Sequence, residues 1–398
     1  MPAPTADLPR DVDRLHGPSI ATAAPAHARL AWFAATFKTV VFSLLPLTLL
    51  YLVSETLLSL LNVRPFDPLP ESRPPVRTTM TSPWGDVRPI REQLFFGVRT
   101  LFESTDFRAF VPPVEKPPGL SRIAFVGDSF VFGVGVEEYD TLPRLVASYL
   151  GYFAPALHVE TINLGIPGAN TQTYARVIET AARYRPELVV VGFTIGNDAE
   201  IVPGSDRTDV PASADPSLVP ADAGAWRRLG SLRDLRDAIV SHSRTLTMLY
   251  RPLRRIESRR RQDLYMHTTF DDPAKWAAVQ ANLRTIADFC RARSIPVVLF
   301  LYPYMFSTPG IGLNDVATYR YDEHHARTRR AAEAVGLRVI DGLDYFREDG
   351  VPSLDPYLVP GDGHPNAAFN GLVARHLAGA IVNHDWFPVT RASDHRAS

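Results

Sequence analysis

The chain has 398 residues, of which 45% are hydrophobic, so it is long enough for one sizeable α/β domain with appended segments. Its formal net charge of −1 at pH 7 gives no overall attraction to nucleic acid, and no nucleic-acid partner is expected. Cys290 is the only cysteine, which excludes an intrachain disulfide. Because it shares helical spacing with Leu283, Ile286 and Phe289, we expect a buried structural thiol rather than a nucleophile.

A long apolar run near the N-terminus predicts one transmembrane helix over residues 39–61. The preceding residues 1–38 are rich in alanine, proline and polar side chains and are predicted to form a disordered tail. Glu55 is the only charged residue in the run and stands near its end, where it can reach the interface. Pro46 is tolerable in such a helix.

Two other interpretations of this run are weaker. A cleaved signal peptide conflicts with the long leader and with the lack of a small-residue cleavage site after the run. A buried core helix conflicts with the length and uniform apolarity of the run. The basic residues before it are Arg10, Arg14, Arg29 and Lys38, and those after it are Arg64, Arg73 and Arg77. This small bias favours an N-terminus inside, with the following domain periplasmic or extracellular.

A proline-rich linker is predicted over residues 62–120. Within it, the apolar residues 94–102 are expected to pack on the domain or to touch the bilayer surface.

From residue 121 to residue 385 apolar strand patterns alternate with helical patterns, which predicts a parallel sheet with helices on both faces. The predicted strands are residues 123–126, 159–163, 188–193, 297–302 and 338–340. The predicted helices include residues 142–150, 173–184, 274–293, 325–334 and 367–382. Residues 386–398 are predicted to be a C-terminal tail.

The alternation breaks at an insertion over residues 203–272. Its first part is polar and proline-rich, and it ends in a basic cluster over residues 254–261. We interpret the cluster as a solvated helix face, with contact to anionic lipid or polysaccharide as the alternative. An insertion of this size on the ligand-binding face is expected to act as a lid or a substrate-selecting module.

The most informative motif is Gly127-Asp128-Ser129, directly after the strand at residues 123–126. Ligands of open α/β sheets bind at the carboxyl ends of the strands, so a serine here stands where substrates bind. A serine hydroxyl is a weak nucleophile by itself and needs a general base and donors for an oxyanion. Ser129 is therefore a candidate nucleophile.

Candidate oxyanion donors follow the next two strands. Gly165 comes at the end of the second strand, where its N–H could approach a ligand, although a tight turn explains a glycine equally well. Asn197, in Gly196-Asn197-Asp198 after the third strand, could offer its side-chain NH₂, with an Asx turn or helix cap as the alternative.

The candidate base is His364, on a loop before the last helix, with the carboxylate of Asp362 two residues earlier. Asn366 is placed to cap that helix. His324 and His325 are interpreted as part of the charged start of a helix. No ligand spacing typical of a metal and no complete phosphate-binding glycine motif is present, so neither a metal nor another cofactor is expected.

Taken together, these four ordered blocks resemble the SGNH (GDSL-type) hydrolase superfamily, in a membrane-anchored bacterial type. Phe130 replaces the leucine of the name-giving motif, and Gly196 and Asn197 are adjacent rather than separated by one residue. Asp362 lies two rather than three residues before His364, a spacing that occurs in some membrane-anchored and acyl-transferring relatives.

The resemblance implies a three-layer α/β/α sandwich with a five-stranded parallel sheet. It implies a serine esterase in which Ser129 attacks the ester, His364 is the base and Asp362 orients it. The oxyanion would bind the N–H groups of Ser129 and Gly165 and the amide of Asn197. The implied substrate is an O-acyl ester of glycan or lipid type. A polysaccharide O-acyltransferase using the same residues, and a non-catalytic binding or scaffold protein, are the alternatives.

Overall fold

The computed structural model describes residues 26–61, 63, 73–103, 107–199, 201, 239–240, 242–306, 310–384 and 386. The chain forms two compact units, Met1–Val63 and Arg64–Ser398. Most of both predicted tails, residues 1–25 and 387–398, lies outside the described residues.

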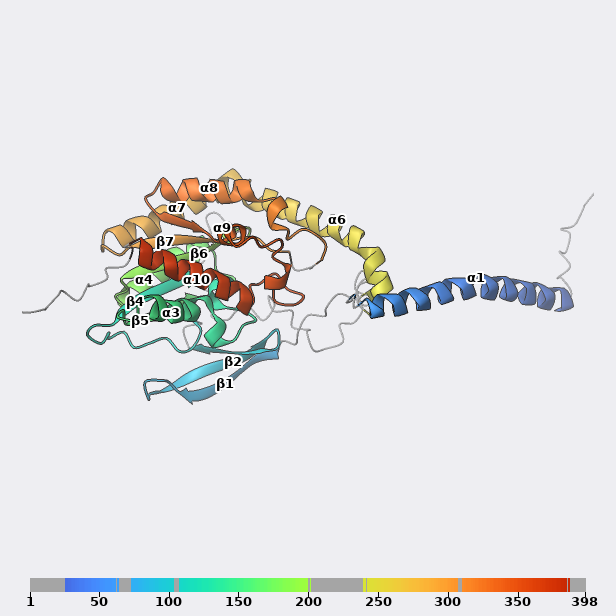
Figure 1. Cartoon of the computed structure of the whole chain (residues 1–398), viewed down its shortest axis with the longest axis horizontal. Coiled ribbons are helices and arrows are strands. Elements are labelled where there is room, and N and C mark those ends of the chain that lie inside the picture. The colour runs from blue at the N-terminus through green and yellow to red at the C-terminus, as the bar shows by residue number, and fades with distance from the viewer. Residues whose placement is uncertain are drawn as a thin grey trace, which may run out of the picture. The chain divides into compact units, whose positions relative to one another are not determined.

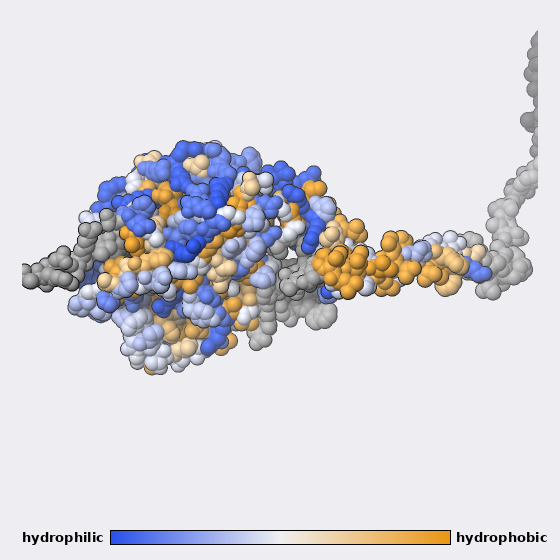
Figure 2. All heavy atoms as spheres, viewed as in Figure 1, coloured by the Kyte–Doolittle hydropathy of each residue, from blue (hydrophilic) through white to orange (hydrophobic). Residues whose placement is uncertain are grey.

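The first unit contains the helix α1 (Ala26–Leu60), which carries Pro46 inside it (Figure 1). The helix starts well before residue 39, so the prediction of a disordered tail is wrong for residues 26–38, where several alanines favour a helix. Its stretch Ala35–Leu60 is long and apolar enough to cross a membrane by length and composition, a test that a signal sequence also passes. Figure 2 shows the hydrophobic surface of this helix, to which Phe42 and Leu60 contribute exposed side chains.

The second unit begins with a three-stranded antiparallel sheet in the order β1-β2-β3. Its strands are β1 (Arg73–Thr81), β2 (Val87–Phe95) and β3 (Val98–Glu103). Pro74 and Pro75 lie in the edge strand β1, where a missing N–H is tolerated and where the register shifts. Part of the predicted linker is therefore a folded sheet, and its prolines concealed the strand pattern.

The main sheet has five parallel strands, as predicted, and their order is β5-β4-β6-β7-β8. The strands are β4 (Ser121–Gly127), β5 (Val159–Gly165), β6 (Leu188–Thr194), β7 (Val297–Tyr302) and β8 (Arg338–Asp341). All residues of β6 are buried, which suits a central strand covered on both faces.

Helices cover both faces of this sheet, which confirms the three-layer α/β/α sandwich (Figure 1). On one face α3 packs against α10, and on the other α4 packs against α7 and α7 against α8. The helices are α2 (Ser129–Phe132), α3 (Leu142–Phe153), α4 (Thr171–Arg183), α6 (Arg244–Thr269), α7 (Pro273–Arg291), α8 (Asp322–Glu333), α9 (Gly342–Glu348) and α10 (Ala367–Asn383). Short 3-10 turns are η1 (Glu138–Asp140), η2 (Val316–Thr318) and η3 (Asp355–Tyr357).

The predicted insertion contains the long helix α6, which holds the basic cluster and is capped by Ser243. The part of the insertion over residues 202–238 lies outside the described residues. Cys290 is buried in the core on α7, as expected for a structural thiol, and burial raises its pKa to about 11.

Candidate active site

Ser129 is the first residue of α2, directly after β4 at the carboxyl edge of the main sheet. The preceding Asp128 caps this short helix, because its Oδ1 accepts the N–H of Phe130 at 2.9 Å. Gly127 has no room for a side chain, since a Cβ would collide with Val131 and approach the Gly192 carbonyl to 3.2 Å. The sharp strand-to-helix turn thus fixes Ser129, which is 9% exposed.

The predicted base reaches the predicted nucleophile, although 235 positions separate them in the chain. His364 Nε2 lies 2.8 Å from Ser129 Oγ, and its Nδ1 is hydrogen-bonded to Asp362. A carboxylate only accepts, so the neutral imidazole carries its proton on Nδ1 and accepts the Ser129 hydroxyl at Nε2. Ser129, His364 and Asp362 therefore form one hydrogen-bonded chain.

A tight loop allows the Asp362 carboxylate to reach the His364 imidazole although the two residues are only two positions apart. Asp362 Oδ1 accepts the backbone N–H of His364 at 2.9 Å, which closes an Asx turn and brings the same carboxylate to the imidazole. Gly361 takes a φ of +75°, and the N–H of Val359 donates to the His364 carbonyl at 2.9 Å. Asn366 caps α10, as predicted, by accepting the N–H groups of the first turn.

The charges around His364 favour its protonated form. Burial alone would lower the pKa of His364, but its hydrogen bond to Asp362 and the charges of Asp362 and Asp128 together raise it above the ordinary value. For Asp362, burial alone would raise the pKa, but the hydrogen bond from His364 and the positive charge of His364 together lower the pKa of Asp362 below its ordinary value. A raised pKa of His364 suits the role of a general base that the sequence predicts for it.

Asp128 also connects the nucleophile to Asn197. The Nδ2 of Asn197 donates to Asp128 Oδ2 at 2.8 Å, while the other oxygen of the same carboxylate caps α2. Asp128 is fully buried, and burial raises its pKa against the effect of these hydrogen bonds. An amide has two N–H donors, and the second one of Asn197 has no acceptor among the described residues. It is therefore available to a ligand.

Gly165 does not have the geometry predicted for an oxyanion donor. Its N–H donates to Asn163 Oδ1 at 3.0 Å, and a Cβ would collide with the backbone of Phe132 in α2. Gly165 therefore serves the close packing of β5 on α2, which corrects its predicted role. Gly168, three residues later, is exposed with a φ of +77°, and its N–H has no acceptor within the described part of the chain.

Two aromatic rings that the motif analysis did not assign to the site lie beside the base. The ring of Phe130 is 5.2 Å from the imidazole of His364, and that of Phe96 is 6.1 Å away, measured between centroids. Phe130 belongs to the nucleophile motif, whereas Phe96 comes from the turn between β2 and β3. The only sequence signal for Phe96 was the apolar run 94–102, expected to pack on the domain.

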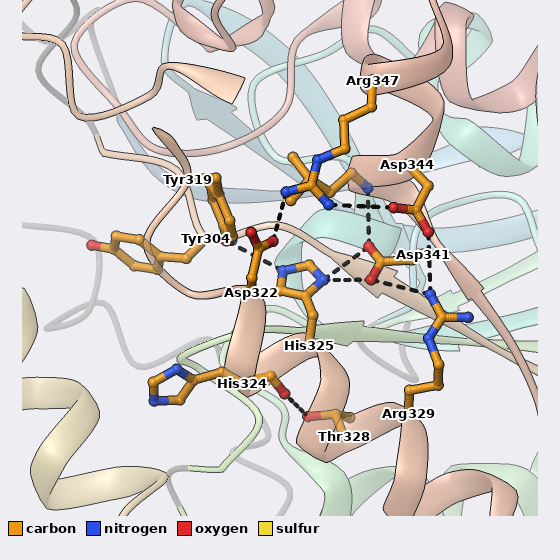
Figure 3. Close-up of polar contacts among 11 residues, drawn as sticks. Tyr304, Tyr319, Asp322, His324, His325, Thr328, Arg329, Asp341, Asp344 and Arg347 are labelled. Carbon is orange, nitrogen blue, oxygen red and sulfur yellow. Dashed lines mark hydrogen bonds and ion pairs between the residues drawn. The ribbon is translucent and has the colours of Figure 1, made fainter. Parts of the chain in front are cut away.

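A second His–Asp pair lies on α8 and β8 (Figure 3). His325 Nδ1 is 2.8 Å from both oxygens of Asp341, and its Nε2 is 3.3 Å from the hydroxyl of Tyr319. Both members are almost fully buried, and Arg329 contacts Asp341 as well. His324 and His325 stand in the first turn of α8, as predicted.

No group of three or more His, Cys, Asp or Glu side chains suited to a metal occurs in the described ranges.

Comparison with known protein families assigns the chain to one of them. Residues 125–372, more than half of the chain, match the GDSL-like Lipase/Acylhydrolase family. The chain belongs to that family and is accordingly an enzyme that acts on esters. No curated protein sequence matches it.

Solved structures of similar fold include a catalytic mutant of Axe2, an acetylxylan esterase from Geobacillus stearothermophilus. It is 16% identical, with a TM-score of 0.36, and the match covers 67% of this chain and 96% of Axe2. Another is a protein from Desulfitobacterium hafniense DCB-2 assigned to the G-D-S-L lipolytic family. It is 13% identical, with a TM-score of 0.35, over 65% of this chain and 98% of that chain.

Proposed function

We propose that this protein is a serine esterase that cleaves an O-acyl ester of glycan or lipid type through a covalent acyl-enzyme. The observation that carries the proposal is the hydrogen-bonded chain from Ser129 Oγ through His364 to Asp362 at the carboxyl edge of the sheet.

In the first half-reaction, Ser129 Oγ attacks the ester carbonyl carbon while His364 Nε2 takes the hydroxyl proton. The tetrahedral intermediate breaks the bond to the alkoxy oxygen, and His364 returns the proton to the departing alcohol. Water then attacks the acyl-enzyme while His364 takes a proton from it. The second tetrahedral intermediate breaks its bond to Ser129 Oγ and releases the acid, and His364 returns the proton to Ser129 Oγ. Asp362 holds the imidazole in the tautomer that both steps need.

The oxyanion needs donors that are not already engaged. The N–H of Ser129 and the second amide N–H of Asn197 meet this requirement in the proposal. Gly168 replaces Gly165 as the third donor, because its N–H lies in an exposed turn that only glycine readily adopts.

Labelling with a fluorophosphonate probe tests the proposal at its first step. The full chain in detergent should be labelled on Ser129, and Ser129→Ala should abolish labelling. Ser148→Ala is the matched control, because Ser148 lies exposed on α3 with its hydroxyl bonded to Arg144, and it should be labelled like the wild type. A folded wild-type chain that takes up no probe would instead support a binding or scaffold role.

Hydrolysis and acyl transfer use the same acyl-enzyme and differ in the final acceptor. The same preparation should release free acid from an acyl donor whether or not a glycan acceptor is present. Transfer to the glycan without net hydrolysis would identify an O-acyltransferase instead.

We propose further that α1 anchors the enzyme in a membrane with the second unit on the periplasmic or extracellular side. Its length and composition support an anchor, and the small excess of positive charges before the apolar run 39–61 supports this orientation. A topology reporter fused after Ser398 should be active only outside the cytoplasm, and activity inside would reverse the assignment.

A further inference from the structure

We infer that the turn between β2 and β3 forms part of the active site, and that Phe96 is a specificity-determining residue for the alcohol portion of the ester. This inference rests on the proposed esterase function and assigns a role to the N-terminal sheet, which contributes none of the predicted catalytic residues. The substrate class it names is an ester of a bulky alcohol with an apolar face, such as a ring, rather than of a small alcohol.

The backbone of Phe96 is unusual for a bulky residue. Phe95 pairs with Val98, which leaves Phe96 and Gly97 as a two-residue turn with φ angles of +49° and +80°. Both values belong to a type I′ turn, in which Asn-Gly or Asp-Gly is the preferred pair. A phenylalanine with positive φ is an outlier, and such strain persists where the surroundings enforce it, often at functional sites.

The hairpin is held against the helix that carries the nucleophile. Phe95 and Phe102 form a buried cluster with Phe132 and Val134, and the rings of Phe102 and Phe132 are 4.8 Å apart. The buried guanidinium of Arg108, just after β3, donates to the carbonyl of Phe132 at 3.0 Å. The turn is therefore fixed relative to Ser129.

The same turn also contacts the loop that carries the base. A Cβ built on Gly135 would be 3.5 Å from Phe96 Cδ2 and 2.8 Å from Val359 Cγ2, so these three residues meet at one point. Val359 is hydrogen-bonded to the His364 carbonyl. Phe96 is half-buried, and its ring centroid lies 6.1 Å from that of the His364 imidazole.

The chemistry of the proposed reaction says which part of the substrate passes this ring. His364 Nε2 gives its proton to the departing alkoxide, so the alcohol must come within hydrogen-bonding distance of that nitrogen. The rings of Phe96 and Phe130 flank the same imidazole. An alcohol with an apolar face therefore gains aromatic contact as it leaves, and a small alcohol does not.

Esters of one acid with two alcohols test this inference. The acyl group is the one that the full-length wild type cleaves fastest, and the alcohols are cyclohexanol and ethanol. We expect the wild type to prefer the cyclohexyl ester and Phe96→Asn to reduce that preference, measured as the ratio of the two kcat/KM values, by about 3–10-fold. Most of the change should be in KM. Phe96→Tyr, which keeps the ring, should retain the preference.

Stability measurements separate this role from a structural one. Asparagine suits the positive φ, so Phe96→Asn should unfold at the same temperature as the wild type or higher while losing selectivity. Trp84→Ala is the matched control, because Trp84 is a partly exposed aromatic in the turn at the other end of β2, and its selectivity should be unchanged.

Three outcomes decide the matter. A ratio that Phe96→Asn leaves unchanged in an active enzyme, including an equal loss for both esters, would overturn the inference. A wild type that neither hydrolyses esters nor takes up the fluorophosphonate would overturn the proposed function itself, and the inference with it. A shifted ratio with normal probe labelling of Phe96→Asn supports both.

Discussion

Two His–Asp pairs of the described residues, those of His364 and His325, differ in what the second ring nitrogen contacts. In both pairs Nδ1 faces a carboxylate, Asp362 for His364 and Asp341 for His325. The Nε2 of His364 faces the hydroxyl of Ser129, whereas the Nε2 of His325 faces the phenol of Tyr319. A His–Asp pair alone therefore does not identify a catalytic base, and the partner of Nε2 decides.

Exposure strengthens this distinction. The side chain of His364 is 23% exposed, and that of His325 is 4% exposed. The hydroxyl of Tyr319 also accepts the N–H of Tyr304 at 2.8 Å, and burial raises the pKa of Tyr319 well above its ordinary value. The pair on α8 thus lies inside a closed polar network, while the pair before α10 opens towards the place where substrate would bind.

Removing the two hydroxyls that face the imidazoles should give the largest contrast. Ser129→Ala should lower kcat/KM by at least about 10⁴-fold, since the nucleophile is lost. Tyr319→Phe should leave kcat/KM within about 3-fold of the wild type, because Tyr319 is not near the reacting atoms in the proposal. Ester hydrolysis by both full-length variants checks this, and comparable losses in the two would contradict the assignment of the pairs.

Replacing the carboxylate of the proposed catalytic pair should change both rate and pH dependence. Asp362→Asn should lower kcat by about 10²–10⁴-fold, because the imidazole loses its enforced tautomer. The base acts when neutral, so activity of the wild type rises as the pH passes upward through the raised pKa of His364. Without the charge of Asp362 that pKa falls, and the acid limb of kcat/KM should move to lower pH. An unmoved limb would show that another group titrates.

The proposed oxyanion donor should have a smaller effect. Asn197→Ala removes one donor and should lower kcat by about 10²–10³-fold with little change in KM. The substitution also leaves buried Asp128 without one hydrogen bond. Thermal unfolding of the variant should therefore be measured alongside, and a loss of activity explained entirely by unfolded protein would argue against the donor role.

The three residues of the proposed catalytic triad could be predicted from sequence because each follows a local signal. Ser129 comes where an apolar strand meets a glycine, and Asp362 and His364 share one short loop before a helix. The five parallel strands were predictable for the same reason, since each is a short apolar run.

What sequence could not resolve depends on long-range contact. Gly165 and Gly168 lie in the same segment, and only the approach of the α2 backbone separates their roles. Phe96 lies in a region whose prolines suggested a linker, and its contact with His364 joins residues far apart in the chain. The pairing of His325 with Asp341 likewise joins two separate elements, α8 and β8. The sequence around His325 indicated only the charged start of a helix.

The smallest effect on activity, with a clear effect on stability, is expected at Asp341. Asp341→Ala removes the acceptor of buried His325 and the cap of α9, and should lower the free energy of unfolding by about 2–4 kcal/mol at pH 7 while kcat/KM stays within about 3-fold. Burial would raise the pKa of Asp341, but His325 outweighs it and lowers that pKa. This contribution is present above the unfolded pKa of about 3.9 and is lost as the pH falls through the lower folded value. Urea unfolding of both proteins at pH 7 and near pH 3 should therefore show the difference shrinking in acid, and a constant difference would mean that packing rather than charge stabilises this pair.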